Sequence, residues 1–447
     1  MNYIPNLEFK EEILKEIGIK TIDELFSDIP EIVRINRLNL PDGKTEMEVK
    51  KEITDTLKKN KRTLSFLGGG IYDNYVPSAV KAIIQRSEFY TSYTPYQPEV
   101  SQGMLQAMFE YQSMIAELTG MDAANASMYD WATSLAEAVL MCSRITRKNE
   151  FIIPKNIHWE KKSVLRNYAT GAKLKIKEIG YDEKTGEIAL DELSNTVNNN
   201  TAGVYVENPN LFGVFENEVD EIKNIIGKAL FVAGVNPLTL GIIKSPDEYG
   251  ADVVVGEGQS FGSPMNFGGP LLGLFACKKE YVRQMPSRLI GMTKDNDGRR
   301  AFCMTLQTRE QHIRREKAAS NICTNESLCA LSTVVYLSLI GSEGLEKIGK
   351  ELVSKAKFLA DEINRIDGFK APLFSSCHFN EFIVRTEKDI DRIHKSLLEK
   401  GIESGLVLKK QFPELENAML CTVSETHSEE DMLRLINALK EVALNGK

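Results

Sequence analysis

Residues 201–236 read TAGVYVENPNLFGVFENEVDEIKNIIGKALFVAGVN, and their pattern indicates the fold class. The β-branched run 201–210 predicts a strand that ends in turn residues, 218–229 predicts a helix, and 229–236 predicts the next strand. Two strands joined by a helix in this order are typical of a right-handed crossover between parallel neighbours.

Further strands are predicted on both sides of that unit, at EFIIP (150–154), KLKIKEIGY (173–181) and ADVVVGEG (251–258). The sequence therefore predicts an α/β fold with a mostly parallel sheet. Ligands of such sheets bind at the carboxyl ends of the strands. We expect the chemistry in the loops that follow Val206, Val235 and Val255.

Three regions are predicted along the chain. Residues 1–60 form an N-terminal helical arm, residues 61–325 a large α/β domain, and residues 326–447 a smaller C-terminal α+β domain. The last helix is expected to begin at a capping box of Thr426 and Glu429.

Composition excludes several classes of protein. The 447 residues carry a net charge of −8 with no basic block, so no nucleic-acid partner is expected. The seven cysteines form no CxxC pair and the five histidines show no metal spacing, which predicts reduced thiols and no metal site. With no signal-peptide pattern and no long uninterrupted apolar run, we expect a cytoplasmic protein without a membrane span.

Three long segments carry a family resemblance: FLGGGIYDNYVPSAV (66–80), YTPYQPEVSQGMLQAMFEYQSMIAELTGMDAANASMYD (93–130) and DGRRAFCMTLQTREQHIRREKAASNICTNESL (297–328). Each resembles the glycine decarboxylase P-protein of the glycine cleavage system. The N-terminal half of that protein, a separate subunit 1 in many bacteria, has about this length. The resemblance implies a fold-type I PLP-dependent transferase fold, similar to aspartate aminotransferase.

The cofactor residues of that fold are missing where the resemblance places them. A PLP enzyme needs a lysine to hold the cofactor and usually an aspartate against its pyridine nitrogen. Gln259 stands at the lysine position and Ala233 at the aspartate position, and no lysine occurs between Lys244 and Lys278. The expected phosphate-binding helix start, ASMYDWATS (126–134), has no glycine. We therefore expect no catalytic residue of PLP chemistry and no bound PLP in this chain.

The resemblance also implies the partners. PLP is expected on glycine decarboxylase subunit 2, in an α2β2 heterotetramer with this chain. The enzyme, glycine dehydrogenase (aminomethyl-transferring), decarboxylates glycine, releases CO2 and passes the aminomethyl group to the lipoate of H-protein. This chain is expected to be inactive alone.

Two segments are candidates for the subunit interface or the substrate channel. The first lies in YTPYQPEVSQG, where aromatic faces, hydroxyls and a carboxylate could line a shared site. The second is an arginine-rich run, in which guanidinium groups could pair with carboxylates, although an exposed basic helix face is the alternative. The candidates are Tyr93, Thr94, Tyr96, Gln97, Glu99, Arg299, Arg300, Arg309, Arg314 and Arg315.

Two other functions stay open at this point. The chain could be an autonomous PLP enzyme that uses an unusual lysine, such as Lys244 or Lys278. It could also be a scaffold or regulator that contributes no side chain to any active site.

Overall fold

The structure is a computed structural model that describes residues 6–35, 38–92, 95–322 and 325–444. The chain forms two compact units, Met1–Lys61 and Arg62–Lys447. Within the second unit, the expected domain boundary near residue 325 stays a prediction.

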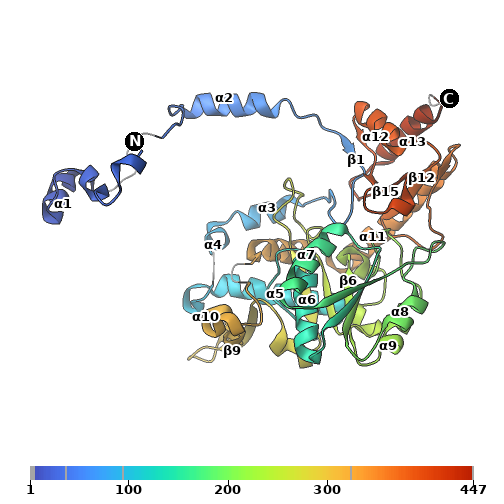
Figure 1. Cartoon of the computed structure of the whole chain (residues 1–447), viewed down its shortest axis with the longest axis horizontal. Helices are drawn as coiled ribbons and strands as arrows, with labels where there is room; N and C mark the ends of the chain where they lie inside the picture. Colours follow the sequence, from blue (N-terminus) through green and yellow to red (C-terminus); the bar gives the residue numbers. More distant parts are fainter. Residues whose placement is uncertain (1–5, 36–37, 93–94, 323–324, 445–447) are drawn as a thin grey trace. The chain divides into compact units, whose positions relative to one another are not determined.

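The first unit is helical and is drawn in blue in Figure 1. It contains short 3-10 helices and two α-helices, α1 (Lys10–Ile17) and α2 (Glu46–Leu57). Thr45 and Glu48 begin α2 with a capping box. The Thr45 hydroxyl accepts from the Glu48 N–H, and the Glu48 carboxylate accepts from the Thr45 N–H.

The second unit is built on a seven-stranded sheet with the order β2-β8-β7-β6-β5-β3-β4. Strands β3 to β7 pair in parallel, and β2 and β8 add an antiparallel edge. The predicted α/β fold with a mostly parallel sheet is confirmed. The bounds are β2 Ala123–Ala124, β3 Glu150–Pro154, β4 Lys175–Ile179, β5 Thr201–Glu207, β6 Leu230–Val235, β7 Val253–Glu257 and β8 Gly273–Cys277.

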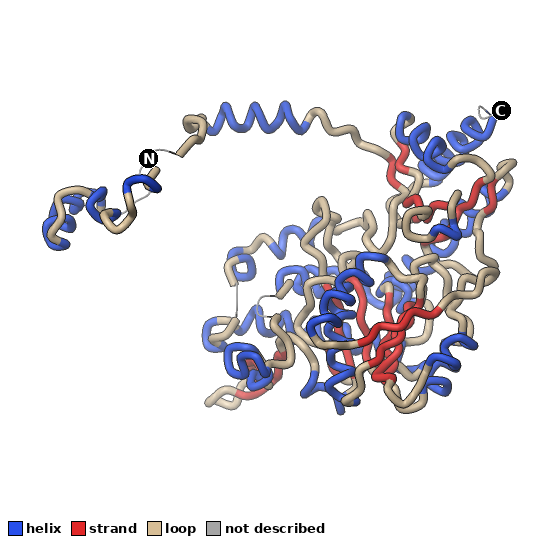
Figure 2. The backbone as a smooth tube through the Cα atoms, in the orientation of Figure 1, coloured by secondary structure: helices blue, strands red, loops and turns tan. Residues whose placement is uncertain are grey.

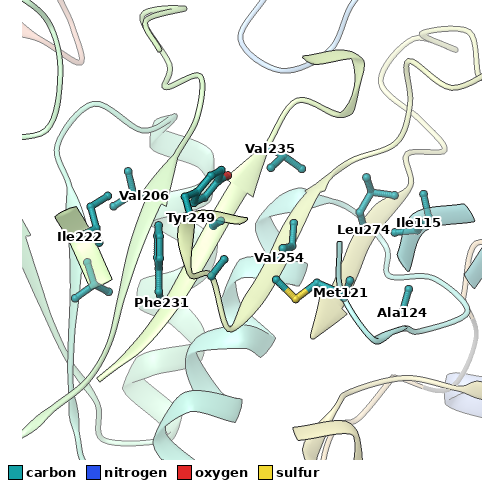
Figure 3. Packing of buried hydrophobic residues seen from close by; sticks show 14 of the residues in the cluster. Ile115, Met121, Ala124, Val206, Ile222, Phe231, Val235, Tyr249, Val254 and Leu274 are labelled. Carbon is teal, nitrogen blue, oxygen red and sulfur yellow. The ribbon is translucent and has the colours of Figure 1, made fainter. Parts of the chain in front are cut away.

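Helices cover both faces of this sheet (Figure 2). Alternate residues of a strand point to opposite faces, so Phe231 and Val235 of β6 pack with the helices of one layer while Val232 packs with the other. Figure 3 shows the first of these clusters, with Ile115 and Ile222 beside strand residues. One layer is α5 (Gln102–Thr119), α8 (Leu190–Thr196) and α9 (Val219–Ile226), and the other is α6 (Trp131–Thr146) and α7 (Trp159–Gly171).

An antiparallel hairpin follows the main sheet and precedes the C-terminal region. Its strands are β9 (Leu289–Lys294) and β10 (Arg300–Thr305), and the short helix α10 (Gln311–Arg314) comes next. The arginine-rich run is therefore a strand followed by three short helices, η8 (Gln307–Arg309), α10 and η9 (Arg315–Lys317), and it does not form the continuous basic helix face of the alternative. Helices α3 (Ser78–Ile84) and α4 (Ser87–Tyr90) lie before α5 in the chain.

The helical segment α11 (Ser327–Asn364) consists of two helices that meet at a kink. It is kinked at Gly341, whose φ of 60° and ψ of −175° are not helical. By length and composition alone α11 could span a membrane, but 44% of its apolar window is buried in the fold, where Val334 and Tyr336 join core clusters.

The C-terminal region adds a four-stranded sheet with the order β11-β12-β15-β14, covered by α12 (Ile390–Glu399) and α13 (Glu429–Leu444). A short parallel pair joins β1 (Leu64–Ser65) to β13 (Ile402–Glu403). The remaining strands are β11 Phe369–Lys370, β12 Glu381–Thr386, β14 Leu406–Val407 and β15 Ala418–Thr422.

Candidate functional site

The carboxyl ends of β5 and β7 bear acidic side chains, and a buried ion pair occupies the crevice there. Glu207 ends β5, and its Oε1 lies 2.8 Å from Nζ of Lys161 on α7. The Tyr205 hydroxyl donates to the same carboxylate oxygen at 2.8 Å. The Lys161 ammonium also lies 3.2 Å from the centre of the Trp131 ring, a cation–π contact. The side chains of Lys161 and Glu207 are only 9% and 2% exposed, and burial lowers the pKa of Lys161.

Glu257, at the end of β7, occupies the start of helix α6. Its carboxylate accepts from the backbone N–H groups of Trp131 at 3.2 Å, Gln259 at 3.0 Å and Leu272 at 2.8 Å. Burial raises the pKa of Glu257 to about 7. Asp130 caps the same helix by accepting from the Thr133 N–H at 2.7 Å. A helix start of this kind can bind a phosphate, but here two carboxylates already face its N–H groups.

Gln259 is fully buried, and its amide is engaged on both sides. Its Oε1 accepts from the Tyr72 N–H at 3.1 Å, and its Nε2 donates to the carbonyl oxygens of Tyr72 at 3.0 Å and Ser263 at 2.7 Å. This side chain anchors the segment around Tyr72, which closes the crevice.

Ala233 lies within β6, two residues before its end at Val235, and its side chain belongs to an apolar cluster. Ala233 therefore lies inside β6 and not at its carboxyl end. The first polar residue beyond β6 is the buried Asn236, whose Oδ1 accepts from the Leu238 N–H at 3.2 Å.

Glu381, the first residue of β12, closes the crevice from the side of the C-terminal sheet. It accepts from the Gly69 N–H at 2.6 Å, the Tyr72 hydroxyl at 2.9 Å and the Thr422 hydroxyl at 3.1 Å. Gly68 is required beside it, because a Cβ there would lie 1.8 Å from the Thr422 hydroxyl oxygen. Burial raises the pKa of Glu381.

The space that remains in the crevice is a cavity of about 50 Å³. Ligand pockets usually measure about 300–1,000 Å³, so a cofactor of the size of PLP does not fit without displacing side chains. His158 lies at its wall, stacked on Trp159 at 4.0 Å, and burial lowers the pKa of His158 to about 4. The lining residues are Gly69, Gly70, Ile71, Asp130, Trp131, Ala132, His158, Glu160, Lys161, Glu257 and Leu271.

The two lysines considered for an autonomous enzyme lie elsewhere. Lys278 follows β8, which pairs antiparallel with β7, so it lies beside the amino end of β7, with its Nζ 3.5 Å from Asp252. Lys244 is exposed and lies 3.3 Å from Asp220. Neither side chain reaches the crevice at the carboxyl ends of the strands.

The candidate interface residues of the first segment lie before and within the short helix Pro98–Val100. Tyr96, Gln97 and Glu99 are exposed. Tyr93 and Thr94 lie outside the described residues.

The arginine candidates differ in their surroundings. Arg299 is exposed on the hairpin, and Arg300 lies 5.8 Å from the Phe302 ring centre. Arg309 instead points inward and donates to the carbonyl oxygens of Leu306, Met285 and Ser287. Its main role is to hold backbone, which makes it the weakest of the interface candidates.

Arg314 and Arg315 lie at the end of α10. Arg314 donates to the Thr308 carbonyl oxygen at 3.1 Å, and Arg315 lines a groove between this segment and helices α6 and α7. Arg309 is thus half-buried and the other four arginines are exposed, while the interface role of all five stays a prediction.

Sequence reasoning missed the buried charged residues Lys161, Glu207, Glu257, Arg288 and Glu381. An acidic residue at the end of an apolar strand was a visible signal for Glu207 and Glu257. Lys161 and Arg288 carry no such signal, because only the tertiary structure brings Lys161 to Glu207 and Arg288 to Tyr96.

Comparison with known proteins agrees with this architecture. A family model described as "Glycine cleavage system P-protein" matches residues 1–439. A relative from Thermococcus onnurineus (strain NA1), named "Probable glycine dehydrogenase (decarboxylating) subunit 1", is 49% identical over 99% of both chains. A relative of the same name from Saccharolobus islandicus (strain L.S.2.15 / Lassen #1) is 46% identical over 99% of this chain and 98% of its own.

Solved structures agree as well. A glycine decarboxylase (P-protein) of the glycine cleavage system, in inhibitor-bound form, has a TM-score of 0.91 at 41% identity and covers 99% of this chain and 100% of its own. Glutamate decarboxylase from Lactobacillus brevis has a TM-score of 0.69 at 12% identity, covers 94% of this chain and 97% of its own, and shares the fold alone. The predicted fold-type I architecture is confirmed. By its sequence over nearly its full length and by its fold, the chain belongs to the glycine cleavage system P-protein family and corresponds to subunit 1.

Proposed function

We propose that this subunit of glycine decarboxylase holds no PLP itself and instead completes an active site on a partner subunit. The observation that carries the proposal is the crevice at the carboxyl ends of the strands. Lys161, Glu207 and Glu257 fill it with mutual or backbone hydrogen bonds, and about 50 Å³ remains.

The residues present do not fit PLP. The crevice lysine, Lys161, is engaged with Glu207, and the side chain that the resemblance places at the lysine position is the buried amide of Gln259. When bound to an enzyme, PLP accepts the electrons released as a carboxylate leaves as CO2. We assign that chemistry to subunit 2, with PLP bound there.

The contribution of this chain is its exposed surface around Tyr96. Tyr96, Gln97 and Glu99 can present a ring, an amide and a carboxylate to a partner. In the proposed assembly, two copies of this chain and two of subunit 2 form the enzyme, and the aminomethyl group passes to the lipoate of H-protein.

Reconstitution tests this proposal. Glycine-dependent bicarbonate exchange is measured with lipoylated H-protein and PLP, using this chain alone, subunit 2 alone and the two together. We expect exchange from the mixture and none from this chain alone. Appreciable exchange by this chain alone would overturn the proposal, and the purified subunits must first be shown to associate by size-exclusion chromatography.

A further inference from the structure

Tyr96 is held by a buried arginine that sequence reasoning did not single out. Arg288 precedes β9 and is 1% exposed. Its Nη2 donates to the Tyr96 hydroxyl oxygen at 3.0 Å, and its guanidinium carbon lies 5.1 Å from the centre of the Tyr96 ring. The backbone of Arg288 is fixed in turn, because its carbonyl oxygen accepts from the Ala126 N–H at 2.9 Å.

This hydrogen bond determines the direction of the tyrosine proton. A guanidinium group has only donors, so the Tyr96 oxygen must be the acceptor and must donate its own hydrogen elsewhere. Among the residues that the structure describes, none is recorded as accepting that hydrogen. Tyr96 is 42% exposed, so the hydrogen is available to a group outside the chain.

The arginine-rich segment contributes His312, which contacts Tyr96, and Glu310, whose carboxylate is a counter-charge to Arg288. His312 meets the Tyr96 ring edge-on, with 5.8 Å between ring centres. The His312 Nδ1 lies 3.7 Å from the carboxylate of Glu310, which is 9% exposed. Burial raises the pKa of Glu310, and the positive charge of Arg288 opposes that rise. Tyr96 is thus restrained by Arg288 on one side and His312 on another.

We propose that Arg288 is a positioning residue that fixes Tyr96 as a hydrogen-bond donor toward an anionic oxygen in the partner's active site. The inference rests on the proposed function, since it requires the surface around Tyr96 to face that site. The anionic oxygen belongs either to the substrate carboxylate or to the cofactor phosphate, which share this chemistry.

A double-mutant cycle in the reconstituted two-subunit enzyme tests the proposal. Tyr96→Phe removes only the hydroxyl, and Arg288→Met removes the donor that orients it. A hydrogen bond to a charged group contributes enough binding free energy that its loss in each variant should lower kcat/KM by about tenfold or more. The double variant should be no worse than Tyr96→Phe, because Arg288 acts through the hydroxyl. Arg288→Lys, which can still donate, should recover part of the loss.

The measured constants separate the two sources of the oxygen. A raised KM for glycine assigns the oxygen to the substrate carboxylate, and a raised PLP concentration for half-activity assigns it to the cofactor phosphate. Arg392→Met is the matched control and should leave activity unchanged, because Arg392 lies 90% exposed on α12.

The outcomes distinguish failure of this inference from failure of the proposed function. If Tyr96→Phe assembles and keeps full activity, the hydroxyl donates to no anionic oxygen of the site and this inference falls, whereas the proposed function falls only if this chain alone shows exchange. If Tyr96→Phe is impaired but the kcat/KM losses of Tyr96→Phe and Arg288→Met multiply in the double variant, only the positioning role of Arg288 is overturned. Should Arg288→Met fail to assemble, Arg288→Lys takes its place in the cycle. If the kcat/KM losses of Arg288→Lys and Tyr96→Phe then multiply in the double variant, the positioning role of Arg288 is likewise overturned.

Discussion

Breaking the buried ion pair of the crevice should destabilise the chain by several kcal/mol. Lys161→Met keeps the bulk of the side chain and its contact with Trp131 but leaves Glu207, which is 2% exposed, without its cation. Removing one partner of a buried ion pair typically costs about 3–5 kcal/mol. Protonation of the remaining carboxyl limits the cost. Free glutamate titrates near pH 4.3, so neutralising it at pH 7 costs about 3.7 kcal/mol.

The free energy lost in Lys161→Met should depend on pH. If the carboxyl is neutral in the folded variant and charged in the unfolded chain, the folded state binds the extra proton and its stability falls as pH rises. The deficit of Lys161→Met should therefore be about 3–4 kcal/mol at pH 7 and about 1 kcal/mol at pH 5. The double variant Lys161→Met/Glu207→Gln removes both charges and keeps an acceptor for Tyr205, so it should recover most of the loss.

Urea unfolding followed by circular dichroism measures these free energies. The chain has two tryptophans, Trp131 and Trp159, and both line or adjoin the crevice, so their fluorescence reports on it directly. Lys350→Met, which breaks an exposed pair with Glu346, is the control and should leave the urea midpoint nearly unchanged. A Lys161→Met loss below about 1 kcal/mol at pH 7, with no recovery in the double variant, would show that Glu207 does not depend on Lys161 as its counter-ion.

Three further predictions concern the crevice and its frame. Gln259→Lys should not make this chain a decarboxylase without its partner, because two carboxylates still occupy the start of α6; glycine decarboxylation within tenfold of the two-subunit enzyme would contradict this. Burial raises the pKa of Glu257 in the folded chain to about 7, so the free energy of unfolding should fall as pH rises from about 4.5 to 7. Glu257→Gln should flatten that slope in urea titrations. Gly213→Ala should unfold at a markedly lower urea concentration than Gly368→Ala. Both glycines have a positive φ, but only at Gly213 would a Cβ lie 1.9 Å from the Glu381 carbonyl oxygen; equal urea midpoints would contradict this.

The fold was largely predictable because its strands are apolar on both faces. EFIIP (150–154) coincides with β3, and the predicted strands that end near Val206 and Val235 are β5 and β6. Apolar runs of this kind are read from the sequence alone, since helices cover the sheet on both sides.

The sequence-based predictions of local structure were wrong where tertiary contacts outweighed the local pattern. Strand β10 was not predicted because it lies in the arginine-rich run, although the alternation of side chains that buries Phe302 and Met304 was visible in the sequence. The last helix is capped by Ser428 and Asp431, and the predicted capping box of Thr426 and Glu429 is wrong.

Those failures have physical causes that a sequence does not display. The Thr426 hydroxyl instead donates to the carbonyl oxygen of Asp73 at 3.1 Å, more than 300 residues away in the chain. Arg309 was grouped with the exposed arginines because no local pattern shows that its guanidinium group binds three backbone carbonyls. The crevice depends on the same kind of long-range contact, between Lys161 and Glu207.

Borohydride trapping shows directly which subunit binds PLP covalently. This chain, alone and assembled with subunit 2, is incubated with PLP and reduced, and the labelled lysines are identified by peptide mapping. We expect stoichiometric label on subunit 2 and none on this chain in either sample, with Lys161 protected by Glu207. Stoichiometric label on one lysine of this chain, at Lys161, Lys244, Lys278 or elsewhere, would contradict it.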